Sequence, residues 1–265
     1  MDVGFIGTGS MGGMLVRSLV RHGALAPEQV WAANRTPGKL EALRAAVPGI
    51  HTAPTATVST CPVVFLCVKP GDTRAALAEM EPALRADQLL ILLSNLVPIA
   101  GVEEQVPCRV AKVIPSLAQE AGCGIALVMY GRRVTPRDRQ WLEGLLGAIS
   151  RPLVIEESQG RTCADLTSCG PAFLACVLRE MALAASRQQP DLPPEMAAAM
   201  ARETVLATAR LLEAGMDFEA IIRRVAVPGG VTAAGLAVLE EQIPGTWEQL
   251  LTATRHREEN APAPV

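Results

Sequence analysis

The sequence of 265 residues predicts an α/β protein, in which a doubly wound parallel sheet in residues 1–155 precedes an all-helical domain in residues 156–265. Two observations support this division. In the first part, short and uniformly apolar runs alternate with helical patterns, which is typical of a parallel sheet covered on both faces. After Glu156 these runs disappear, and apolar residues recur at the spacing of helices.

The expected elements of the first part follow one another in β-α order. Right-handed β-α-β crossovers of this size build a doubly wound domain. Helical spacing in the second part is clearest at Leu174, Val177, Leu178 and Met181. Strands are expected at 3–6, 29–33, 63–68, 89–93, 109–114, 124–128 and 153–155, and helices at 11–22, 37–46, 73–84 and 136–149.

Composition excludes several classes of protein. With 49% hydrophobic and 19% charged residues the chain is too apolar to be disordered, and its net charge of −3 argues against a surface that coats nucleic acid. The longest segment without a charged residue, 45–68, contains three prolines and is unsuited to a membrane-spanning helix. No basic segment precedes the first apolar run, so we expect no signal peptide. We expect a cytoplasmic protein that binds neither nucleic acid nor membrane.

The cysteines and histidines give no pattern of metal ligands. The seven cysteines include no C-x-x-C pair, and the three histidines share no ligand spacing with them. We therefore expect free thiols in a reducing compartment and no metal site.

A glycine-rich turn, Gly7-Thr8-Gly9-Ser10-Met11-Gly12, lies between the first strand and the first helix. In a dinucleotide-binding fingerprint the first glycine makes the tight turn, the second lets the backbone approach the pyrophosphate, and the third packs helix on strand. The pyrophosphate then lies at the positive end of the helix. The motif in this context predicts a Rossmann-type nucleotide-binding domain.

The residues after the second and third strands indicate which nucleotide binds. Asn34-Arg35-Thr36 follows the second strand, where an NAD site would carry a carboxylate for the ribose 2′-OH. Arg35 and Thr36 can instead hold a 2′-phosphate, so NADP is preferred over NAD, which remains the alternative coenzyme. Val68-Lys69-Pro70 ends the third strand, where we expect a contact to ribose or phosphate. The alternatives are a solvated turn in which Asn34 caps the next helix, and a solvated Lys69.

Two segments of the helical part suggest a substrate site. Val227-Pro228-Gly229-Gly230-Val231-Thr232 precedes an apolar helix, and its free N–H groups would suit a substrate carboxylate. Thr232 could donate a hydrogen bond to the substrate, or it could cap the helix. Ser168-Cys169-Gly170-Pro171-Ala172-Phe173 interrupts a helical segment and forces a kink or a new start.

Together these residues resemble the pyrroline-5-carboxylate reductase family over nearly the whole chain. The segment 228–241, PGGVTAAGLAVLEE, is the most specific part of the resemblance. The other matching segments are 4–12, Asn34-Arg35-Thr36, 63–70, 109–115 and Gly170-Pro171-Ala172-Phe173.

The resemblance implies NAD(P)H-dependent reduction of the cyclic imine of pyrroline-5-carboxylate to proline. It implies that Gly229, Gly230, Val231 and Thr232 bind the substrate, with the Thr232 hydroxyl at the imine nitrogen, and that Cys169 lines the same site. It also implies a helical dimerisation domain that interlocks two subunits, with dimers that often assemble into decamers.

Three departures from the family pattern favour a different class of function. Ser116 stands where the family has an asparagine, Cys169 replaces a serine, and Val227 replaces the serine before Pro-Gly-Gly. These variants are similar to the late competence protein ComER, a reductase-like branch of the family. The alternative is therefore a regulatory, competence-associated protein that keeps nucleotide binding and has lost turnover.

A second enzyme family can be set aside. Gly9-Ser10-Met11-Gly12 is also similar to the fingerprint of β-hydroxyacid dehydrogenases, which need a lysine on the long helix after the sheet. No lysine follows Lys112, so this alternative fails.

Overall fold

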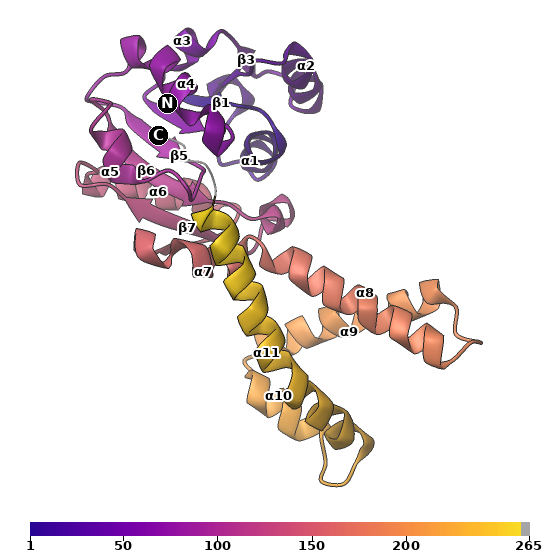
Figure 1. Ribbon diagram of the computed structural model, residues 1–265. Coiled ribbons are helices and arrows are strands. Elements are labelled where there is room, and N and C mark those ends of the chain that lie inside the picture. Colours follow the sequence, from indigo (N-terminus) through magenta and orange to yellow (C-terminus); the bar gives the residue numbers. More distant parts are fainter. Residues whose placement is uncertain (261–265) are drawn as a thin grey trace. The chain divides into compact units, whose positions relative to one another are not determined.

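Residues 1–260 are described by the structure, a computed structural model (Figure 1). They form two units: the first contains residues 1–169 and 255–260, and the second contains residues 170–254. The last strand ends at Val154, next to the boundary that we expected at residue 156. Helix α7 (Gly160–Thr167) nevertheless belongs to the first unit, because Ala164 is buried against the sheet.

The first unit contains one eight-stranded sheet in the order β3-β2-β1-β4-β5-β6-β7-β8. β1 lies between β2 and β4, with Val3 in register with Val30 and Val63. The strands are β1 (Val3–Ile6), β2 (Val30–Ala33), β3 (His51–Thr52), β4 (Val63–Leu66), β5 (Leu89–Leu92), β6 (Arg109–Ile114), β7 (Ile125–Tyr130) and β8 (Arg151–Val154).

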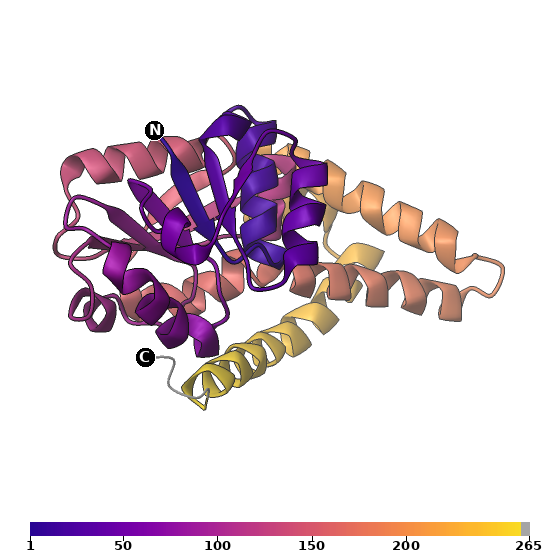
Figure 2. The same cartoon turned by 90° about the horizontal axis from the view of Figure 1, so that it is seen from above.

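Helices cover both faces of this sheet, which Figure 2 shows from above. Helices α1 (Ser10–Arg21), α2 (Pro37–Ala46) and α6 (Pro136–Gly147) pack on the core around Phe5 and Phe65, whose rings stack. The opposite core receives α3 (Thr55–Val58), α4 (Thr73–Met80), α5 (Ile99–Glu103) and α7. The α/β fold class with a doubly wound sheet is thereby confirmed.

The expectation of an all-parallel sheet was wrong at one place. β6 and β7 run antiparallel, with Ala111 opposite Tyr130, whereas every other neighbouring pair is parallel. The connection between them is short and carries only a 3-10 turn, Leu117–Ala121. A parallel return needs a crossover of roughly a dozen or more residues, usually with a helix, so the short connection forces an antiparallel pair. The two-residue β3 and the short helices α3 and α5 were also not expected.

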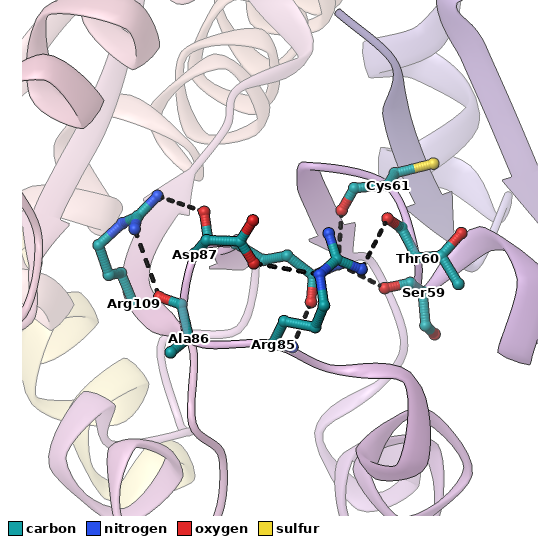
Figure 3. Close-up of polar contacts among 8 residues, drawn as sticks. Ser59, Thr60, Cys61, Arg85, Ala86, Asp87 and Arg109 are labelled. Carbon is teal, nitrogen blue, oxygen red and sulfur yellow. Dashed lines mark hydrogen bonds and ion pairs between the residues drawn. The ribbon is translucent and has the colours of Figure 1, made fainter.

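Polar side chains fasten the loops that enter β5 and β6 (Figure 3). The buried side-chain amide of Gln88 donates to the carbonyl oxygens of Ser59 and Cys61, both at 2.7 Å. The Arg109 guanidinium donates to the carbonyl oxygens of Ala86 and Asp87 at 3.3 and 2.7 Å. These bonds hold the amino-terminal ends of β4, β5 and β6 in place, at the edge of the sheet away from the glycine turn.

The second unit is helical, with α8 (Gly170–Gln188), α9 (Pro194–Glu213), α10 (Phe218–Val225) and most of α11 (Val231–Glu259). Helices α8 and α9 lie side by side and bury only small residues against each other, namely Ala182, Ala197 and Ala201. Many larger apolar side chains of this unit are exposed, among them Leu174, Val177, Met181, Met196, Met200 and Leu206.

One helical stretch, Glu157–Gln188, is long and apolar enough to cross a membrane, by length and composition alone. It includes the separate helices α7 and α8, and only 11% of its apolar window is buried. A single stretch of this kind is weak evidence for a membrane, because an interface helix of a protein assembly has the same composition.

Candidate functional site

The glycine turn adopts the geometry that a dinucleotide-binding turn requires. Gly7 has a φ of +95°, and its N–H donates to the Ala33 carbonyl oxygen at 2.8 Å. A Cβ atom on Gly12 would collide with the Gly7 carbonyl oxygen and approach Cys67, so only glycine lets α1 pack this closely. A Cβ on Gly9 would meet no atom within 4 Å, so this part of the turn faces open space.

The start of α1 carries unused hydrogen-bonding groups. Gly9 is the N-cap residue, no side chain caps the helix, and the first turn contains no acidic residue. The Thr8 hydroxyl is buried and has no hydrogen-bond partner among residues 1–260. Free N–H groups at a helix start, together with the positive end of the helix dipole, favour an anion. These groups therefore fit the pyrophosphate of a dinucleotide.

Asn34 connects the end of β2 to this turn. Its side-chain oxygen accepts from the Thr8 N–H at 3.0 Å, and its side-chain nitrogen donates to the Thr36 carbonyl oxygen at 3.1 Å. The N-cap position of α2 belongs to Thr36, whose side chain makes no capping bond. Asn34 is therefore a turn-fixing residue, and the alternative in which it caps α2 is wrong.

Arg35 and Lys69 lie at the same carboxyl-terminal edge of the sheet. Arg35 follows β2 and is exposed, and its Nη2 atom forms an ion pair with Oδ1 of Asp72 at 2.9 Å. Asp72 ends the 3-10 turn Pro70–Asp72, which begins directly after the exposed Lys69. The structure thus brings the residues after β2 and after β4 together, with Val68 half-buried beneath them.

A buried lysine lies at the neighbouring strands, and sequence reasoning assigned it no role. The Lys112 side chain in β6 is 1% exposed, and its ammonium donates to Glu157 Oε1 at 2.5 Å and to the Asn95 carbonyl oxygen at 3.2 Å. Burial lowers the pKa of Lys112, and the hydrogen bond and charge of Glu157 oppose that shift. The Asn95 side chain also donates to Glu258 in the last turn of α11. A lysine inside the apolar strand RVAKVI was the available clue, because such a charge must be paired.

Two of the three residues that depart from the family pattern, Ser116 and Cys169, make hydrogen bonds within the first unit. The buried Ser116 hydroxyl donates to the Thr167 carbonyl oxygen at 2.9 Å and accepts from the Ala118 N–H at 3.4 Å. The Cys169 sulfur accepts from Arg161 Nη2 at 3.4 Å. Ser116 therefore fastens α7 to the end of β6, which is a structural task that a serine performs here.

The glycine segment of the second unit forms a tight turn into α11. Gly229 has a φ of +73°, and the Gly230 N–H donates to the Val227 carbonyl oxygen at 3.0 Å. Helix α11 begins at Val231, so Thr232 lies inside the first turn and is not the N-cap residue. The Thr232 side chain is half-buried, so its hydroxyl is not sealed off from solvent. The Val231 side chain is 92% exposed. This arrangement leaves the Thr232 hydroxyl available to a ligand.

Comparison with known proteins identifies the relatives of this chain. Residues 157–261 match the family model for pyrroline-5-carboxylate reductase dimerisation, and residues 2–95 match that for coenzyme F420-dependent NADP oxidoreductases. ComE operon protein 4 of Bacillus subtilis is 32% identical over 98% of this chain and 96% of its own length. Pyrroline-5-carboxylate reductase 3 of the same organism is 29% identical over 97% of this chain and 96% of its own length.

Solved structures show the same fold. The pyrroline carboxylate reductase of Plasmodium falciparum with NADP bound is 18% identical, with a TM-score of 0.86 over 97% of each chain. The pyrroline-5-carboxylate reductase of Coxiella burnetii is 24% identical, with a TM-score of 0.85 over 97% of each chain. The resemblance found in the sequence, including its ComER-like features, is confirmed. The chain belongs to the pyrroline-5-carboxylate reductase family of NAD(P)-dependent oxidoreductases.

Proposed function

We propose that this protein reduces 1-pyrroline-5-carboxylate to L-proline with NADPH in the cytoplasm. The observation that carries the proposal is the glycine turn, where an uncapped helix start and an unpartnered Thr8 hydroxyl are tied by Asn34 to the segment that carries Arg35. Family membership supplies the reaction class, because the protein shares its full length with a pyrroline-5-carboxylate reductase.

The first unit holds the coenzyme in this proposal. Residues of the turn, Gly7, Thr8, Gly9, Ser10, Met11 and Gly12, bind the pyrophosphate through N–H groups and the Thr8 hydroxyl. Arg35 and Thr36 bind the 2′-phosphate, while Val68, Lys69 and Pro70 contact ribose and phosphate. Bound NADPH supplies the hydride that reduces the C=N bond, and NAD(H) is the second coenzyme.

The second unit binds the substrate in this proposal. N–H groups of Gly230, Val231 and Thr232, at the start of α11, hold the substrate carboxylate, and the Gly230 N–H also donates to the Val227 carbonyl oxygen. Gly229, with its positive φ, permits the turn that presents them. The Thr232 hydroxyl faces the imine nitrogen, where it orients the neutral imine by donating to the nitrogen lone pair or relays a proton to that nitrogen. A role of this kind typically raises the rate of the chemical step roughly 10²–10⁴-fold. Cys169 lies in the first unit, and we propose that its thiol contributes to the substrate site in the place of a serine.

In this proposal the functional protein contains a second copy of the chain. The exposed apolar side chains of α8 and α9 are too numerous for one copy to bury, since these helices bury only three alanines between them. Exposed apolar faces of this size mark association surfaces. We propose a homodimer through the second unit, and the dimers can assemble further into a decamer.

The three departures favour a second candidate function. ComE operon protein 4 is similar to this chain over nearly its whole length, and Ser116 is occupied in fastening α7. Val227 is 60% exposed and offers no polar group before the Pro-Gly-Gly turn. The alternative is a competence-associated regulatory protein that binds the nucleotide without turnover.

One assay separates the two functions. Purified protein is mixed with NADPH and pyrroline-5-carboxylate, nicotinamide oxidation is followed by absorbance, and proline is measured in the same samples. Stoichiometric proline formation supports the reductase. NADPH binding without proline formation would instead support the regulatory protein and contradict the reductase.

A further inference from the structure

The Arg35–Asp72 ion pair bears on the choice between the two coenzymes. Arg35 is the charged residue after β2, at the place where Rossmann-type domains recognise the ribose 2′ substituent. Its guanidinium is 2.9 Å from the Asp72 carboxylate, which approaches from the turn after β4. The cation that would attract a 2′-phosphate is therefore already paired with an anion of the same protein.

The Asp72 carboxylate lies at the positive end of α4, but it is not needed to cap this helix by a hydrogen bond. Asp72 is the N-cap residue of α4, yet its side chain makes no capping hydrogen bond, and its backbone N–H donates to the Lys69 carbonyl oxygen instead. The side chain is 35% exposed, so an asparagine of the same shape can be solvated there. Its only ion pair among residues 1–260 is with Arg35.

We infer that Asp72 is a specificity-determining residue that weakens binding of the 2′-phosphate and so lets the site accept NADH beside NADPH. The inference rests on the proposed coenzyme site. A phosphate that contacts Arg35 has to displace or share this carboxylate, and it then lies within a few ångströms of a like charge. The 2′-hydroxyl of NADH carries no charge, so Asp72 does not oppose it in this way. Because the pair is open to solvent, the effect on affinity is modest.

The test compares Asp72→Asn with a matched control, Asp87→Asn. Asp87 also pairs with an arginine on the surface of the first unit, Arg85, at 3.1 Å (Figure 3). It precedes β5 and so lies at the amino-terminal edge of the sheet, whereas Arg35 and Asp72 follow β2 and β4. Dissociation constants are measured by calorimetry for NADPH and NADH. Adenosine 2′,5′-bisphosphate and adenosine 5′-monophosphate serve as a second pair of probes, because they differ only in the 2′-phosphate.

Asp72→Asn should tighten NADPH and adenosine 2′,5′-bisphosphate about fivefold at low salt, and leave NADH and adenosine 5′-monophosphate within about twofold. Asp87→Asn should leave the dissociation constants of all four ligands within about twofold of the wild-type values. Equal changes for both members of each pair, or an unchanged NADPH/NADH ratio, would overturn the role of Asp72. If the wild-type protein binds both nucleotides but forms no proline, only the proposed reductase activity is overturned. The NADPH/NADH ratio of dissociation constants in Asp72→Asn then still decides the role of Asp72. A wild-type protein that binds neither nucleotide overturns both.

Discussion

Replacing Glu157 by glutamine should destabilise the protein more than replacing the buried Lys112 by methionine. The two side chains form one ion pair, but Lys112 is 1% exposed and Glu157 is 39% exposed. Glu157→Gln removes the carboxylate that is hydrogen-bonded to the buried ammonium and leaves only the charge of Glu258 nearby, while the glutamine oxygen can still accept the hydrogen bond. Lys112→Met leaves a carboxylate that water can solvate, and the methionine fills most of the space of the lysine stem.

The expected magnitudes follow from this asymmetry. Removing one partner of a fully buried ion pair costs roughly 3–5 kcal/mol. Since the hydrogen bond survives and the pair is partly solvated, we expect about 2 kcal/mol for Glu157→Gln. Lys112→Met orphans only the Asn95 carbonyl oxygen, so its cost should stay below about 1 kcal/mol. Glu203→Gln breaks an exposed ion pair with Arg202 and serves as the control, with an effect within about 0.5 kcal/mol.

Urea unfolding at neutral pH, followed by circular dichroism, measures these differences. Protein concentration is held constant, because association with a second copy also stabilises the folded state. The reasoning is refuted if Lys112→Met costs as much as Glu157→Gln or more, since the burial of the charge would then not be the deciding factor.

Three further predictions concern the site and the pH dependence. Thr232→Ala should lower kcat about 10²-fold and leave NADPH affinity within twofold, whereas an unchanged kcat would remove Thr232 from the chemistry. Arg35→Asp should shift the NADPH/NADH ratio of dissociation constants toward NADH by at least about tenfold, and an unchanged ratio in the same titration would contradict the assigned contact. Burial raises the pKa of the Cys61 and Cys108 thiols from 9.0 to about 11, so their contribution to stability is complete below pH 9 and is lost as the pH rises through 11. Replacing both by alanine should flatten the decline of the unfolding free energy over that range, as measured by urea titrations at each pH.

Local sequence patterns predicted most of the first unit. Seven of the eight strands were expected, and each begins and ends within two residues of its expected position, chiefly because buried strands such as Val63–Leu66 are uniformly apolar. The glycine turn was predictable because its backbone leaves few choices of residue at Gly7 and Gly12. The strand β7 was expected, but its antiparallel direction was missed although the short connection before it was visible, because apolar content does not record strand direction.

Contacts between distant residues could not be predicted from these patterns. Asp72 and Arg35 are separated by 37 positions, and nothing in either local segment indicates that the turns after β2 and β4 meet. The same is true of Asn95 and Glu258, which join the end of β5 to the last turn of α11. Strand order, which places β1 between β2 and β4, brings Arg35 and Asp72 together, and the return of the end of α11 to the first unit brings Glu258 to Asn95.

The two halves of the proposed site tolerate sequence change differently, and this explains why two functions remain in competition. The nucleotide half depends on backbone: a φ of +95° at Gly7, the absence of a Cβ at Gly12, and N–H groups at the start of α1. Side chains around it can therefore change while binding persists. In the proposed substrate half, backbone N–H groups hold the carboxylate but the imine is oriented by the Thr232 hydroxyl, and two of the three departures from the family, Cys169 and Val227, lie among or next to the residues proposed for this half. Loss of turnover would accordingly leave nucleotide binding intact, so proline formation, and not NADPH affinity, is the measurement that decides between the reductase and the regulatory protein.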